Sequence, residues 1–144
     1  MDYRLIAGML IFALALLIQF SLGAAGVAVD LVLAALIVFA FFYGWQTLVL
    51  FVLSAVFLLN EGIGVTPSIL LFAVIPFAVY AVRRVFALAA WAGIPAAIVL
   101  GFALLYALIA PYMFTAALPL VAIDIGGGLV FGELAFALLH AAER

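Results

Sequence analysis

The sequence predicts an all-α protein, a polytopic bundle of about six transmembrane helices that forms a single integral membrane domain over residues 1–144. Hydrophobic residues make up 74% of the chain and charged residues only 7%, whereas a soluble domain carries about 25% charged residues. The apolar residues form long runs that match the ~30 Å hydrocarbon core of a bilayer. The four basic residues, all arginines, are spaced so that they can share one side of a membrane.

The first helix is expected over residues 5–22, LIAGMLIFALALLIQFSL. This run of 18 residues is longer than the ~7–15 residues of the hydrophobic region in a secretory signal peptide. We therefore expect a membrane helix rather than a cleaved leader.

The second and third helices are expected within residues 27–60. A single helix over this stretch would be about 50 Å long, too long for one crossing. Gly44 lies between Tyr43 and Trp45, and aromatic residues favour the membrane–water interface. The stretch therefore predicts two short helices that break at Gly44, or a hairpin that enters and leaves on one side.

Three further helices are expected after a polar turn, NEGIGVTP, at residues 60–67. Its glycines permit a positive φ, and Pro67 suits the first turn of a helix. We expect the fourth helix over 67–82, the fifth from about 86 or 93 to 110, and the sixth over about 118–141.

The arginines predict the orientation, because basic residues accumulate on the cytoplasmic side of a membrane. With Arg4 in the cytoplasm and six crossings, Arg83, Arg84 and Arg144 also fall in the cytoplasm. Both termini are therefore expected there. Merging residues 27–60 into one crossing would place the arginine pair outside, so five crossings is the poorer model.

Small residues at a spacing of four predict close helix contacts, either inside the bundle or with a partner helix. The residues with this spacing are Gly93, Ala97 and Gly101 in the fifth helix, and Gly128 and Gly132 in the sixth.

Gln19, Asp124 and Glu133 are the candidate polar residues inside the membrane. Glu133 lies near the middle of the sixth helix, where an acid costs ~2.5–3.5 kcal/mol to insert, so it should face protein or water rather than lipid. Glu133 has two possible roles. It forms a functional site, which binds a proton or cation or holds a partner helix, or it forms a structural hydrogen bond inside the bundle to Gln19, Tyr80 or Tyr106. Asp124 lies nine residues earlier and so on the opposite face of a regular helix.

The remaining chemistry of the chain argues against an enzyme. It has one histidine, no cysteine, no phosphate-binding loop and no metal-ligand spacing. We expect no catalytic residues, no metal and no cofactor. Ten charged side chains are too few to form a nucleic-acid-binding surface.

Three stretches of the chain resemble the MreD family of rod shape-determining proteins. LIQFSL (17–22) resembles the LLQxSL end of that family's first helix, and VDLVLAALIVFAFFYG (29–44) resembles its second helix, with Asp30 at an acidic or amide position. LSAVFLLNEGIGVTPSILLF (53–72) resembles the family signature GLLLDxxxGxxLGxxAL. In this third stretch, Asn60 replaces the usual aspartate, Gly64 keeps the first glycine, and Ser68 replaces the next.

The resemblance implies a non-enzymatic membrane scaffold of the bacterial cell-wall elongation machinery, located in the cytoplasmic membrane. Its expected partners are the lipid bilayer, an MreC-like protein with a single membrane span, the polymerase RodA with its penicillin-binding transpeptidase, and MreB. The expected architecture is similar to that of the substrate-binding S components of energy-coupling-factor transporters.

Two alternatives stay open from the sequence. One is an S component that binds a vitamin or other micronutrient for uptake. Such components dock their coupling protein through Ala-x-x-x-Ala pairs on the first helix, a spacing that Ala7, Ala13 and Ala15 lack. The other is a small ion or proton carrier built around Glu133. A pocket of ~300–1,000 Å³ open to the outer side would favour uptake, and a closed bundle would favour the scaffold.

Overall fold

A computed structural model describes residues 2–60, 64, 66–86 and 90–144 of the chain. These residues form helices and no strands, which confirms the predicted all-α class. Seven helices are present in the described part: α1 (Tyr3–Ala24), α2 (Leu31–Phe42), α3 (Trp45–Leu59), α4 (Pro67–Phe86), α5 (Ala90–Ile109), α6 (Met113–Ala116) and α7 (Leu118–Ala142). The four-residue α6 is the one element that the sequence did not predict.

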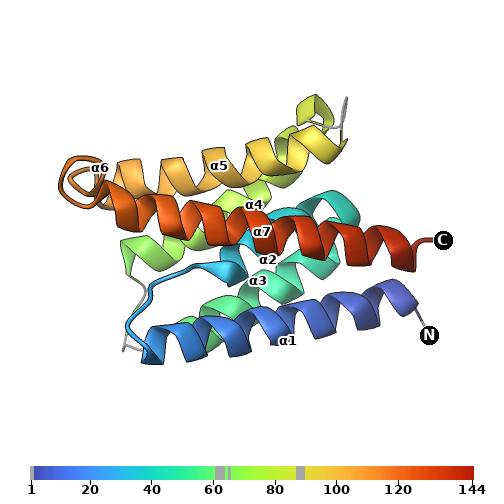
Figure 1. Cartoon of the computed structure of the whole chain (residues 1–144). Helices are drawn as coiled ribbons and strands as arrows, with labels where there is room; N and C mark the ends of the chain where they lie inside the picture. The colour runs from blue at the N-terminus through green and yellow to red at the C-terminus, as the bar shows by residue number, and fades with distance from the viewer. Residues whose placement is uncertain (1, 61–63, 65, 87–89) are drawn as a thin grey trace.

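Four of these helices, α1, α4, α5 and α7, are long and apolar enough to cross a membrane. The helices α2 and α3 are apolar but shorter, with 12 and 15 residues. Figure 1 shows the long helices side by side, with the chain reversing direction from one to the next. The length and composition of these helices indicate a membrane protein, and the number of crossings stays a prediction.

The helix α2 forms the centre of the bundle and contacts α1, α3, α4, α5 and α7. Its first ten residues, Leu31–Ala40, are all buried. The sequence LVLAALIVFAFF has no polar face, and a helix that is apolar all round is stable only when neighbours surround it. The other helices therefore pack around α2.

The chain turns between α2 and α3 where the sequence predicted a break. Tyr43 and Gly44 have extended backbone conformations, and α3 starts at Trp45. This confirms the break. The two short helices run in opposite directions (Figure 1), as both two short crossings and a hairpin require. At 1.5 Å per residue, α2 is about 18 Å long, so it covers only part of a ~30 Å core. The non-helical segment that precedes α2 supplies the rest of this path through the bundle (Figure 1).

The predicted small-residue faces lie inside the bundle. Gly93, Ala97, Gly101, Gly128 and Gly132 are all buried. A Cβ added to Gly128 would lie 2.9 Å from Cζ of Phe102, and one added to Gly101 would lie 2.8 Å from Cδ1 of Ile37. The expectation of close helix packing is confirmed. Gly128 and Gly132 face helices of the same chain, whereas Ala97 and Gly101 also line an apolar groove of about 160 Å³ between α4 and α5.

The two chain ends meet at one end of the bundle, where the arginines gather. Arg4 forms an ion pair with Glu143, and its carbonyl accepts a hydrogen bond from the Tyr43 hydroxyl. Arg83 donates from Nη1 to the carbonyls of Ala40 and Tyr43, at 3.0 and 3.2 Å. Arg4 and Arg83 therefore share one end of the bundle with the C-terminus, as the orientation argument requires. The side of the membrane that this end faces stays a prediction.

Candidate functional site

The most polar region inside the bundle surrounds the beginning of α2. The first N–H groups of a helix have no partner within it, and burying them without hydrogen bonds costs free energy. Asp30 is the residue before α2, yet its carboxyl makes no capping hydrogen bond to the helix that it precedes. Two side chains from other helices accept hydrogen bonds here instead.

Asp124 of α7 is the first of these side chains, and it is 1% exposed. Its Oδ1 accepts the backbone N–H of Asp30 at 2.6 Å, and its Oδ2 accepts the Tyr106 hydroxyl at 2.5 Å. Asp124 therefore links α5, α7 and the beginning of α2 through one carboxyl group.

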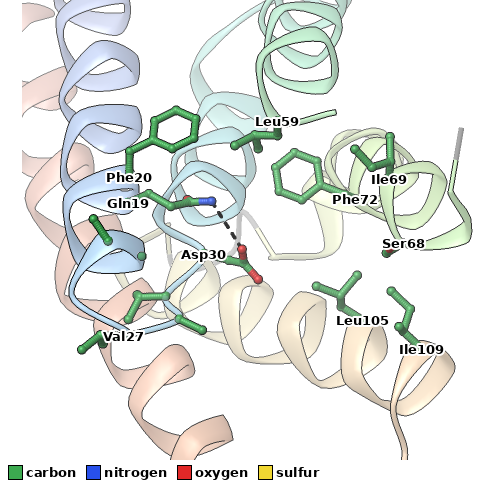
Figure 2. A pocket seen from close by; sticks show the side chains of 14 residues that line it. Gln19, Phe20, Val27, Asp30, Leu59, Ser68, Ile69, Phe72, Leu105 and Ile109 are labelled. Atoms are coloured by element: carbon green, nitrogen blue, oxygen red, sulfur yellow. Dashed lines mark hydrogen bonds between the residues drawn. The ribbon is translucent and has the colours of Figure 1, made fainter. Parts of the chain in front are cut away.

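Gln19 of α1 is the second. Its Oε1 accepts the backbone N–H of Val32 at 2.9 Å, and its Nε2 donates to Oδ1 of Asp30 at 3.5 Å (Figure 2). Three helices thus hold the beginning of α2 in place, and the Asp30 carboxyl keeps a second oxygen with no hydrogen bond to a described residue.

A pocket of about 560 Å³ lies beside Asp30. It is bounded by the end of α1, the segment before α2, the end of α3, the beginning of α4 and the end of α5. This is the end of the bundle opposite the two termini (Figure 1). The lining residues are Gln19, Phe20, Gly23, Ala24, Val27, Ala28, Val29, Asp30, Leu59, Ser68, Ile69, Phe72, Leu105 and Ile109.

The structure joins two of the three predicted intramembrane polar residues. Gln19 and Asp124 both hydrogen-bond to the beginning of α2, but Glu133 is not part of this network. The suggested bonds from Glu133 to Gln19, Tyr80 or Tyr106 are wrong, since Oε1 of Glu133 is buried without a hydrogen-bond partner. Gln19 and Tyr106 bond to the aspartates instead.

The predicted separation of Asp124 and Glu133 is confirmed. The helix α7 runs unbroken through its three consecutive glycines, from Leu118 to Ala142. Asp124 is buried beside the beginning of α2, whereas Glu133 is half-buried on another face of α7. The two carboxyl groups do not form a pair.

The residues of the predicted signature turn have different roles. Ser68 lines the pocket, and its hydroxyl lies 3.1 Å from that of Thr66. Asn60 is the residue that follows α3. Gly64 has φ of +134°, a conformation that favours glycine, as its place in a turn predicted. Glu61 and Gly62, which belong to the same turn, lie outside the described residues.

Asp30 belongs to this site but was not among the polar residues predicted inside the membrane. Its acidic position was noted only as part of the resemblance to MreD. A signal was present, because an aspartate directly before a fully apolar run of helix formers marks a helix start.

The polar groups at this site suit binding more than coordination of a metal. In the described part of the chain, no three His, Asp or Glu side chains gather closely enough to hold a metal ion. The site offers instead a carboxylate and an amide beside an apolar wall, which can hold a small molecule or order the backbone.

Comparison with known proteins gives no relative: no family model, no curated protein and no solved structure matches this chain.

Proposed function

We propose that this protein is a non-enzymatic membrane scaffold of the bacterial cell-wall elongation machinery, similar in kind to MreD. In this proposal it lies in the cytoplasmic membrane with both termini in the cytoplasm. It holds an MreC-like partner by that partner's single helix, and through it RodA, the penicillin-binding transpeptidase and MreB.

The observation that carries the proposal is the convergence of the three stretches that resemble MreD. They follow one another in the first half of the sequence, at 17–22, 29–44 and 53–72. In the structure, each of them lines the same pocket, through Gln19, Asp30 and Ser68 (Figure 2). Three weak similarities that meet at one place support the resemblance more than the same three scattered over the fold would.

The lateral surface supports the proposal in a second way. Large apolar side chains are exposed along α1, including Met9, Leu10, Leu14 and Leu17. In a bilayer such a surface meets lipid or another membrane helix. Because the small-residue faces are used inside the bundle, a partner helix would pack against these larger side chains.

The test is co-expression with an MreC-type protein and, as a control, with an unrelated single-span protein of similar length. The scaffold proposal predicts that the MreC-type protein co-purifies in mild detergent and the control protein does not. Single tryptophan substitutions at exposed residues, Leu17 on α1, Leu53 on α3 and Leu134 on α7, then identify the docking face, because each adds bulk on one helix only.

The opposite result is equally clear. If the folded protein elutes without the MreC-type partner and retains a small molecule, the scaffold proposal is wrong.

A second candidate function is the substrate-binding subunit of a small-molecule uptake system. The pocket favours it, since 560 Å³ falls within the ~300–1,000 Å³ of typical ligand sites. The two functions differ in a measurable way: the uptake subunit requires a coupling protein and a bound ligand, whereas the scaffold requires the single-span partner.

A further inference from the structure

The carboxyl group of Asp30 has an unusual position for a residue that precedes a helix. Such an aspartate usually accepts a hydrogen bond from its own helix, but Asp30 makes none. Asp124 and Gln19 supply the acceptors for the beginning of α2. In the described part of the chain, no backbone N–H bonds to the Asp30 carboxyl, and its one hydrogen bond is the long side-chain contact of 3.5 Å with Gln19.

This carboxyl points into the pocket. In Figure 2, one Asp30 oxygen faces Gln19 and the other is directed toward the side of the pocket where Leu105 lies; Leu59, Phe72 and Ile109 line the same pocket. These four side chains come from α3, α4 and α5 and form an apolar wall opposite the acid. One charged group facing an apolar wall is typical of a site that orients an amphipathic small molecule.

The charges around the pocket favour a cation. Among the described residues that line it, Asp30 is the one with an ionisable side chain. The chain has no lysine, and all four arginines lie in the described residues without lining this pocket. Arg4 and Arg83 bond to groups at the other end of the bundle. A second carboxyl, Asp124, lies behind Asp30 and accepts its backbone N–H.

We propose that this pocket binds a small organic cation, an amine with an apolar body, whose ammonium group pairs with Asp30. The apolar body lies against Leu59, Phe72, Leu105 and Ile109. The ammonium donates to the free Asp30 oxygen, and such a charge-assisted hydrogen bond is strong inside a low-dielectric site. The proposal goes beyond the scaffold function and does not depend on it.

The test uses the full chain in zwitterionic lipid nanodiscs and three probes of similar shape: 2-phenylethylammonium, 2-phenylethanol and 3-phenylpropanoate. Isothermal titration measures binding, with empty nanodiscs as the reference for partition into lipid. The proposal predicts saturable binding of the ammonium. It also predicts binding of the alcohol at least about tenfold weaker, and no binding of the carboxylate.

Two substitutions with the same change of charge separate the site from the rest of the chain. Asp30→Asn should weaken ammonium binding at least about tenfold. Asp2→Asn, at an exposed residue at the other end of the bundle, should leave it unchanged. If Asp30→Asn does not fold, Ile109→Trp provides a second variant. Ile109 is exposed and lines the pocket, so the larger side chain should fill the site and abolish binding.

Three results would overturn the proposal. The first is no saturable binding of the ammonium up to millimolar concentration, and the second is equal affinity for all three probes. The third is unchanged affinity in folded Asp30→Asn or, if that variant does not fold, in Ile109→Trp. Co-purification with an MreC-type partner is expected to persist in Asp30→Asn, so the failure of one proposal can be told from the failure of the other.

Discussion

Replacing Asp124 tests whether the polar network holds the beginning of α2 in the bundle. In Asp124→Leu, the N–H of Asp30 and the hydroxyl of Tyr106 both lose the acceptor that lies 2.6 and 2.5 Å away. Asp124→Asn has nearly the same shape and also removes the charge, but its amide oxygen can still accept the Asp30 N–H. Comparing the two variants isolates the hydrogen bonds from the charge.

The size of the effect follows from burial. A buried donor left without a partner costs about 1–3 kcal/mol, so two of them would cost about 2–6 kcal/mol. Tyr106 is only half-buried, so its hydroxyl can turn toward another acceptor, and hydrogen bonds in membrane bundles average nearer 0.6 kcal/mol. We therefore expect Asp124→Leu to lower the free energy of unfolding by about 2–4 kcal/mol, and Asp124→Asn by less than about 1 kcal/mol.

The assay is reversible unfolding in mixed micelles of dodecylmaltoside and SDS, followed by tryptophan fluorescence. Ammonium binding in nanodiscs provides a second measurement, because a displaced Asp30 should bind the probe less well. If Asp124→Leu is as stable as Asp124→Asn to within about 0.5 kcal/mol, a typical limit for neutral substitutions, the network does not hold α2 and the reasoning is wrong.

Three further predictions use the same unfolding assay. Gly128→Ala should lower the free energy of unfolding by about 1–2 kcal/mol, because the new Cβ would lie 2.9 Å from a buried aromatic ring. Gly126→Ala on the same helix, with no atom within 4 Å of its Cβ, should be neutral or slightly stabilising. Equal effects of the two substitutions would contradict the packing described for α7. Arg83→Met should lower the free energy of unfolding by about 1–3 kcal/mol, because two hydrogen bonds to carbonyls at the end of α2 are lost. Arg84→Met, at an exposed position, should lower it by less than about 0.5 kcal/mol. A larger loss in Arg84→Met than in Arg83→Met would exclude a stabilising role for these two hydrogen bonds. Glu133→Leu should be neutral or stabilise the isolated protein, because it removes a buried Oε1 that has no hydrogen-bond partner. A decrease in the free energy of unfolding of more than about 1 kcal/mol would contradict this and show that Glu133 stabilises the bundle.

Local sequence chemistry was sufficient for the positions of most helices. The break at Gly44 and the helix start at Pro67 both follow from the preferences of glycine, aromatic residues and proline, and the structure has them at these residues. The burial of α2 follows from its apolar composition on every face.

Hydropathy alone does not locate the beginning of α2, although Asp30 is a typical residue before a helix. Residues 27–29, Val-Ala-Val, are as apolar as the helix that follows, so hydropathy does not separate them from it. The helix begins at Leu31 where Asp124 and Gln19 accept the N–H groups of Asp30 and Val32. These acceptors come from α7 and α1, so tertiary contacts decide the boundary.

The polar residues show the same limit. The sequence identified Glu133 as costly because of its depth in the helix, and Gln19 and Asp124 as polar groups inside the membrane. Helical spacing separated Asp124 from Glu133 correctly, but it could not reveal which of them meets Tyr106 and Asp30. That pairing depends on how α5 and α7 pack against α2, which no local pattern encodes.

The proposed orientation is tested most directly by measuring on which side of the membrane the pocket lies. The chain has no cysteine, so a single introduced cysteine is the only site for a membrane-impermeant maleimide. Ser68 lines the pocket, and Gln46 lies near the beginning of α3, at the opposite end of the bundle (Figure 1). Both residues are exposed, so each can be replaced by cysteine and labelled. In intact spheroplasts, we predict labelling of Ser68→Cys alone, and labelling of both after permeabilisation. Labelling of Gln46→Cys in intact spheroplasts, with Ser68→Cys protected until permeabilisation, would contradict the account.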